Sequence, residues 1–137
     1  MRYWLMKSEP DAYAWTKLVA DGLGHWDGVR NHQASNNMKA MTAGDRAFFY
    51  HSSEGREIVG VMEIARAFYP DPDDATGKWG MVDVRPLHPV KRPVTLAEIK
   101  AEPRLKNFLL VRNSRLSVMP LSPEEWKIVC HMGKIAP

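Results

Sequence analysis

Trp26 is the side chain whose surroundings best suit binding chemistry. It lies in the polar, glycine-rich stretch from His25 to Asn31, where nothing in the local pattern calls for a buried indole. An indole in a loop supplies a flat apolar wall, and two such walls form a slot for a planar ring. Stacking of a base on an aromatic ring contributes roughly 1–3 kcal/mol. Trp79, after an acidic loop, could be the second wall, although core packing explains it more readily and explains Trp26 equally well.

Polar groups beside such a slot would recognise the edge of the bound ring. Asparagine, serine and backbone groups have the donors and acceptors that this needs. The sequence therefore allows a site for a planar heterocycle near Trp26.

The motifs of common catalytic and metal sites are missing. The chain has no Gly-Lys-Ser/Thr phosphate loop, no His-Glu-x-x-His and no Gly-x-Ser-x-Gly. A triad of His51, Ser52 and a remote aspartate could be drawn, but such triples arise by chance in most chains. The acidic segment 71–74 lacks the spacing of a calcium loop, so a solvated turn is expected there. The pattern favours a protein that is not an enzyme and needs no metal and no cofactor.

Hydrophobic periodicity predicts an α+β fold that would position these groups. Helices are expected over 16–21 and 31–41, a hairpin turn over 53–56, and strands over 2–7, 46–52, 57–69 and 79–87. Capping boxes predict helices that begin after Thr95 and Ser122, and Cys130 should lie on the buried face of the second. We expect one domain, residues 1–137, with about five or six mostly antiparallel strands that can close into a small β-barrel flanked by short helices.

Charge is distributed unevenly along the chain. Residues 45–84 carry eight acids against four lysines and arginines, whereas residues 85–115 carry eight lysines and arginines against two acids. The basic segment is compatible with a surface that faces phosphates, or simply with a solvated face. The candidates for contacts with a nucleic-acid backbone are Lys91, Arg92, Arg104, Lys106, Arg112 and Arg115.

Composition limits where the protein would act. The chain is 45% hydrophobic and 26% charged, with one cysteine and no apolar run long enough to cross a bilayer. Its first residues lack the apolar stretch of a signal peptide, and one cysteine cannot form an intrachain disulfide. We expect a cytoplasmic monomer without membrane contact.

Five blocks of sequence, in order, resemble the EVE domain family. They are YWLMKSEP at 3–10, WDGVRNHQASNN at 26–37, FFYHS at 48–52, residues 79–84, and RLSVMPL at 115–121. The resemblance implies a PUA-like fold and kinship with YTH domains, which hold a methylated adenine in an aromatic cage. It also implies recognition of modified bases, including modified cytosines in DNA.

The resemblance further implies a set of ligand-binding residues. Trp26 would be the main cage aromatic, Trp79 a further wall, and the other matching positions would line the pocket: Lys7, Ser8, Glu9, Asp27, Val29, Arg30, Asn31, Tyr50, His51, Ser52, Ser117 and Val118. Ser35 stands where many members have an arginine, which removes a phosphate contact.

Each polar position in these blocks also has a structural explanation. Ser8 and Asn31 could cap the helices that follow them, and Arg30 could pair with Asp27. Lys7 could be a solvated strand end, and His51 could bond within a turn.

Two functional hypotheses follow. The first is a non-catalytic module that binds DNA or RNA carrying a modified cytosine or adenine, with that base flipped into an aromatic pocket. The alternative is a binder of, or an enzyme acting on, a nucleoside-like metabolite, with His51 or Glu9 as general base. An RNA-binding module without preference for a modification is a weaker third reading. Which base, polymer or protein partner is involved does not follow from the sequence.

Overall fold

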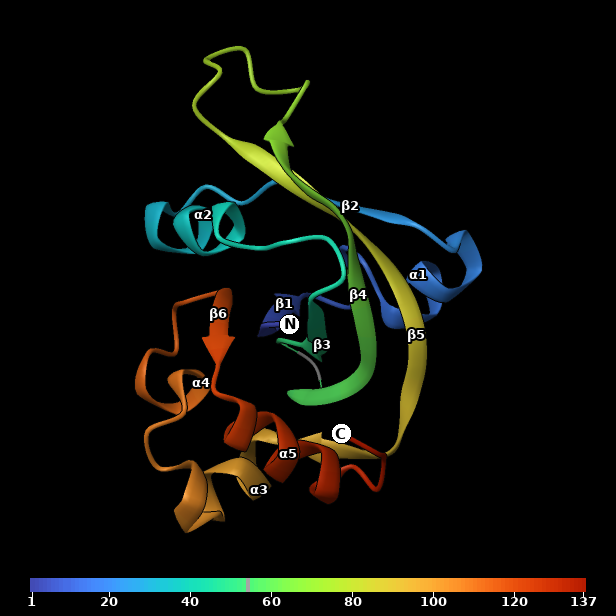
Figure 1. The fold of residues 1–137 in the computed structure, drawn as a ribbon, viewed down its shortest axis with the longest axis vertical. Coiled ribbons are helices and arrows are strands. Elements are labelled where there is room, and N and C mark those ends of the chain that lie inside the picture. Colours follow the sequence, from blue (N-terminus) through green and yellow to red (C-terminus); the bar gives the residue numbers. More distant parts are fainter. Residues whose placement is uncertain (54) are drawn as a thin grey trace.

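A six-stranded mixed sheet forms the centre of the molecule. The computed structural model describes residues 1–53 and 55–137 (Figure 1). The strands run in the order β2-β5-β4-β3-β1-β6, and every neighbouring pair is antiparallel except β1 and β3. They are β1 (Tyr3–Ser8), β2 (Gly24–Trp26), β3 (Arg46–His51), β4 (Glu57–Pro70), β5 (Gly80–Thr95) and β6 (Val118–Leu121). This confirms the α+β, mostly antiparallel architecture.

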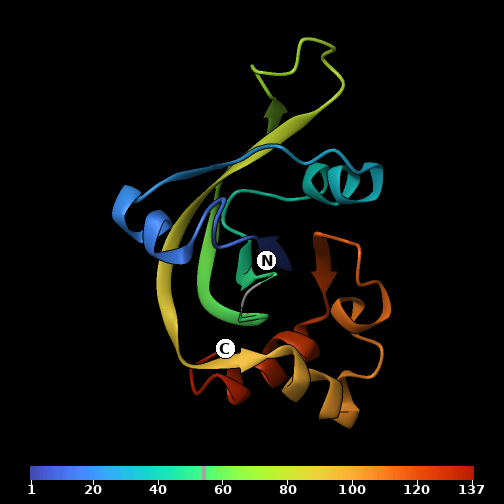
Figure 2. The same cartoon turned by 180° about the vertical axis from the view of Figure 1, so that it is seen from behind.

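The sheet is open at its two outer strands. Within the described part of the chain, β2 and β6 are edges and do not pair with each other. The expected closure into a barrel is therefore not observed. β4 and β5 instead form a long bent hairpin that curves around β1 and β3, and its tip extends beyond the rest of the molecule (Figures 1 and 2).

Short helices cover the open sheet. They are α1 (Trp15–Asp21), α2 (His32–Lys39), α3 (Leu96–Ala101), η1 (Pro103–Leu105), α4 (Leu109–Arg112) and α5 (Pro123–Met132). Helices α3 to α5 gather at the end of the molecule opposite the hairpin tip, as both views show (Figures 1 and 2). Among the described residues, no helix is long and apolar enough to cross a membrane.

Central strand β3 divides the core into two aromatic groups. Phe48 stacks on Trp126 of α5 with ring centroids 3.9 Å apart. The next residue, Phe49, points to the other face and packs edge-on against Trp15 and Trp26. Because successive residues of a strand face opposite sides, β3 is buried on both faces. The Phe49 side carries the candidate site.

Helix starts agree closely with the sequence pattern. Thr95 and Ser122 form the predicted capping boxes with Glu98 and Glu125. Cys130 is buried on α5, and burial raises its pKa to about 11. The hairpin turn expected at 53–56 includes Glu54, which lies outside the described residues.

The prediction was wrong about the end of β5. The strand was expected to stop at residue 87 but continues to Thr95, through Pro89 and Pro93. Register shifts between β4 and β5 interrupt the regular pairing along this stretch. Bulges tolerate residues that lack a backbone donor, so the prolines do not end the strand.

Candidate functional site

The main cavity lies where three chain segments meet. It has a volume of about 420 Å³, within the range of roughly 300–1,000 Å³ typical of small-molecule sites. The segments are the end of β1 with the turn after it, β2 with its connection to α2, and the residue before β6. The lining residues are Lys7, Ser8, Glu9, Ala12, Tyr13, His25, Trp26, Asp27, Gly28, Val29, Arg30 and Ser117.

Hydrogen bonds fix the wall that follows β1. The Lys7 amide donates to the Ser117 carbonyl at 2.8 Å, which joins two segments of the lining. The Ser8 hydroxyl donates to the Tyr13 carbonyl at 2.6 Å, and the Tyr13 amide donates to the Glu9 carbonyl at 2.9 Å. Ser8 therefore closes the turn at 9–13. The structural alternative, in which Ser8 caps α1, is not what the structure shows.

Trp26 is both a core residue and a wall of the cavity. It is 7% exposed, and its ring meets Phe49 nearly at right angles with centroids 5.4 Å apart. The chain turns away immediately after it at Gly28, whose φ of 75° favours glycine. The two explanations considered for Trp26, core packing and pocket wall, therefore both describe its position.

His25 lies beside Trp26 in β2 and is held by a buried carboxylate. Its Nδ1 lies 2.7 Å from Asp83 Oδ1, across the β2–β5 ladder. The Tyr69 hydroxyl donates to the same oxygen, and burial together with Asp83 raises the pKa of Tyr69 to about 12. This pairing was not predicted from the sequence. The sequence signal for it was a charged residue between two apolar ones in an expected strand, Val82-Asp83-Val84, which indicates a carboxylate that needs a partner.

Lys7 lines both the main cavity and a second one of about 290 Å³. Its side chain is half-buried, and its Nζ donates to the Ser114 carbonyl at 2.9 Å. Burial lowers the pKa of Lys7. The solvated strand end considered for Lys7 is therefore not what the structure has. Tyr50 and Ser52 line the second cavity and not the main one.

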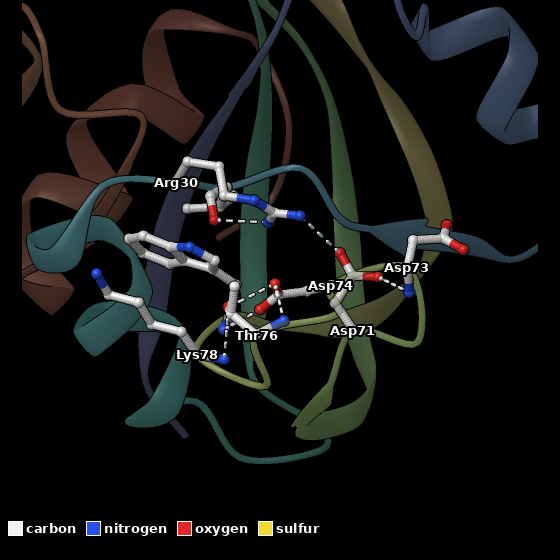
Figure 3. Close-up of polar contacts among 8 residues, drawn as sticks. Arg30, Asp71, Asp73, Asp74, Thr76 and Lys78 are labelled. Carbon is white, nitrogen blue, oxygen red and sulfur yellow. Dashed lines mark hydrogen bonds and ion pairs between the residues drawn. The ribbon is translucent and has the colours of Figure 1, made fainter.

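Arg30 connects the main cavity to the hairpin tip (Figure 3). One guanidinium nitrogen lies 3.4 Å from a carboxylate oxygen of Asp71, whose side chain is only 3% exposed. Arg30 therefore pairs with Asp71, where the sequence analysis had considered Asp27. Asp71 is buried and ion-paired, whereas Pro72 and Asp73 form an exposed turn, so the solvated turn expected over 71–74 is present except at Asp71.

Two of the three carboxylates at the hairpin tip, those of Asp71 and Asp74, accept hydrogen bonds from the loop itself. Asp71 accepts the amide of Asp73, and Asp74 accepts from Thr76 and from the Trp79 amide (Figure 3). The hydrogen bond from the Thr76 hydroxyl, followed by that from the Trp79 amide, lowers the pKa of Asp74 to about 2. Across residues 1–53 and 55–137, no three His, Cys, Asp or Glu side chains converge as metal ligands would.

Trp79 does not line the main cavity. Arg30 does line the cavity, and its guanidinium carbon is 5.8 Å from the centroid of the Trp79 ring. The His32 ring and the Lys78 Nζ are 5.0 and 5.4 Å from the same ring. The slot with Trp26 and Trp79 as facing walls is therefore not formed in this structure.

Several other residues in the motif blocks hold the scaffold. His51 Nε2 accepts the Trp15 amide at 3.1 Å and so caps the start of α1. That bond needs an unprotonated Nε2, and burial lowers the pKa of His51 accordingly. Asn31 Oδ1 accepts the Ala34 amide at 2.9 Å and caps α2, as its structural explanation predicted. Val118 is fully buried.

The six cations proposed for backbone contacts do not border the main cavity. Two of them pair with neighbouring acids, Arg92 with Glu98 at 2.6 Å and Arg104 with Glu102 at 2.5 Å. Arg112 Nε donates to the carbonyl of Lys106. Lys91 and Arg115 are exposed. The cationic side chains that line the cavity are instead those of Lys7 and Arg30.

Comparison with known proteins identifies the family. The EVE domain model matches residues 2–132. Thymocyte nuclear protein 1 of Homo sapiens is 35% identical over 169 residues, covering 98% of this chain and 75% of that protein.

Solved structures of similar proteins support the same family assignment. A Rhodopseudomonas palustris protein has 56% identity and a TM-score of 0.93, with 98% of this chain and 94% of that chain covered. Human thymocyte nuclear protein 1, in complex with DNA containing 5-methylcytosine, has 35% identity and a TM-score of 0.88 with both chains fully covered. The YTH domain of Zygosaccharomyces rouxii MRB1, at 18% identity, 99% and 88% coverage and a TM-score of 0.62, shares the fold. The chain therefore belongs to the EVE domain family.

Proposed function

We propose that this chain is a single-domain, non-catalytic module that takes a modified nucleobase of DNA or RNA into the main cavity. The observation that carries the proposal is the cavity beside Trp26, in a chain 35% identical to a protein whose structure holds DNA containing 5-methylcytosine. That relative supports a base within a nucleic acid as the ligand.

The lining has the chemistry that a nucleobase needs. Trp26, Ala12 and Val29 provide apolar surface for a ring and an added methyl group. Glu9 offers a carboxylate, the acceptor type that pairs with the exocyclic amino group of cytosine. Moving a base out of its stack costs a few kcal/mol, which stacking and hydrogen bonds within the pocket offset.

The arrangement is less favourable to the enzymatic alternative. His51, one of its two candidate bases, does not line the cavity, and its Nε2 already accepts the Trp15 amide. Only Glu9 remains of that pair, and it is exposed. A general base normally lies within hydrogen-bond reach of the proton it removes.

A titration with short DNA and RNA strands tests the proposal. The strands carry a panel of modified cytosines and adenines, and tryptophan fluorescence is followed at two salt concentrations. We expect one modified strand to change the fluorescence at lower concentration than its unmodified match, with affinity falling as salt rises. Equal affinity for both strands would favour a general nucleic-acid module, and no response to any strand would favour a free metabolite.

Location and assembly belong to the same proposal. We place the protein in the cytoplasm as a monomer. Its single cysteine, Cys130, is free and buried, which is compatible with a reducing compartment and excludes a dimer linked through a disulfide.

A further inference from the structure

Lys7 is a half-buried cation without an acidic partner in the described part of the chain. Its ammonium contacts the neutral Ser114 carbonyl, and none of the recorded ion pairs includes it. Burying a charge is unfavourable unless an opposite charge or several hydrogen bonds compensate it. An anion beside Lys7 would supply that compensation.

The second cavity provides a space beside Lys7 with the right lining. It has a volume of about 290 Å³ and shares Lys7 with the main cavity. Arg56 is its second cation, and none of its described lining residues is acidic. The other described lining residues are four hydroxyl donors and two leucines: Tyr50, Ser52, Ser53, Ser114, Leu96 and Leu110.

Arg56 is held at this cavity by an unusual backbone conformation. Its φ is 45°, in the left-handed region that side chains other than glycine rarely adopt. Its carbonyl accepts the Leu96 amide at 2.8 Å, which ties it to the start of α3. The guanidinium of Arg56 has no recorded acidic partner in the described residues and matches the geometry of a phosphate.

We propose that the second cavity binds a phosphate group, that of the nucleotide whose base occupies the main cavity. This inference rests on the proposed function, because the main cavity must hold the base. The two cavities adjoin at Lys7, and one sugar joins the base and phosphate of a nucleotide. Lys7 and Arg56 would neutralise the phosphate, and the serine and tyrosine hydroxyls would donate to its oxygens.

Calorimetric titrations can isolate the phosphate. The probes are 5-methyl-2′-deoxycytidine, its 5′- and 3′-monophosphates, the matching dinucleotide and inorganic phosphate. The quantity of interest is the affinity of each nucleotide divided by that of the nucleoside. We expect one monophosphate to bind about tenfold or more tighter than the nucleoside, as charge-assisted hydrogen bonds do elsewhere. A dinucleotide that keeps the gain indicates a polymer phosphodiester, whereas a gain confined to monophosphates indicates a free nucleotide.

Variants assign the gain to this cavity. Arg56→Ala should reduce the affinity ratio to about threefold or less. Arg56→Lys should restore part of the ratio, because lysine keeps the positive charge but lacks the paired N–H donors of the guanidinium. Lys127→Ala is the matched control, since it removes an exposed lysine of α5 that lines neither cavity. Circular dichroism checks that each variant is folded.

The outcomes separate this inference from the proposed function. A nucleoside that binds without any gain from a phosphate overturns the phosphate site and leaves the base site standing. If inorganic phosphate binds, Arg56→Ala removes that binding and the nucleoside does not bind, the phosphate site is supported and 5-methylcytosine is not the base. Failure of every probe overturns the phosphate site.

Discussion

Replacing Trp26 tests the base site, but its position in the core requires a matched comparison. The ring is 7% exposed and packs on Phe49, so truncation to alanine leaves a large void. Trp→Ala changes in cores cost about 3–5 kcal/mol, a large share of the roughly 5–15 kcal/mol that stabilises a typical domain. Trp26→Ala would therefore confuse lost binding with lost folding. Trp26→Leu keeps apolar volume and removes the aromatic wall.

Trp15 provides the control. It also packs on Phe49, with centroids 5.5 Å apart against 5.4 Å for Trp26, and it is 9% exposed. It does not line the main cavity. Trp15→Leu and Trp26→Leu should therefore lose similar amounts of stability, about 1–3 kcal/mol each in urea denaturation.

Only Trp26→Leu should weaken base binding. Loss of a stacking wall worth about 1–3 kcal/mol corresponds to a loss of affinity of roughly five- to 150-fold for the modified strand. Affinity is measured by calorimetry below the unfolding transition of both variants. Equal losses in the two variants would show that binding depends on the core and not on the wall. Wild-type affinity in Trp26→Leu would refute the stacking role.

Three further predictions concern the scaffold. His51→Ala should destabilise the fold by about 1 kcal/mol through loss of the Trp15 cap. Burial lowers the pKa of His51 below its usual 6.5, so the folded state of the wild type should lose stability as the pH falls below 6.5 and keep full stability above it. Urea melts of His51→Ala should show a weaker dependence on pH. Asp45→Ala should cost about 2–4 kcal/mol in urea denaturation, because the buried Asp45 accepts the Trp4 indole N–H at 3.0 Å together with two backbone amides. Gly60→Ala should lower the melting temperature, since its added Cβ would lie 2.5 Å from the Trp15 ring, and an unchanged temperature would contradict this packing.

The local elements could be predicted because their signals are local. The capping boxes at Thr95 and Ser122 are complete within four residues of sequence, and the structure forms both. The end of β5 could not be predicted, because Pro89 and Pro93, beyond the expected end, normally interrupt a strand. What permits them is the shifting register against β4, which depends on contacts between distant residues.

The candidate site was predictable in part for the same reason. The segments after β1 and around Trp26 do meet at one cavity, as the resemblance implied. Trp79 does not line it but lies near Arg30, which pairs with Asp71, 41 residues away. His25 and Asp83, 58 residues apart, meet only through the pairing of β2 with β5. No periodicity within either segment encodes such contacts.

The polar residues of the motif blocks divide into those that build the cavity and those left free to recognise a ligand. Asn31 and His51 cap helices, and the Ser8 hydroxyl closes the turn beside the cavity. Since these bonds hold the walls in place, a ligand would meet a cavity that is already formed, and less ordering free energy opposes its binding. The carboxylates of Glu9 and Asp27 line the cavity and carry no ion pair in the described residues, whereas the Lys7 ammonium bonds to Ser114 at the second cavity. Discrimination between bases should therefore follow these two carboxylates more closely than the identity of the capping residues.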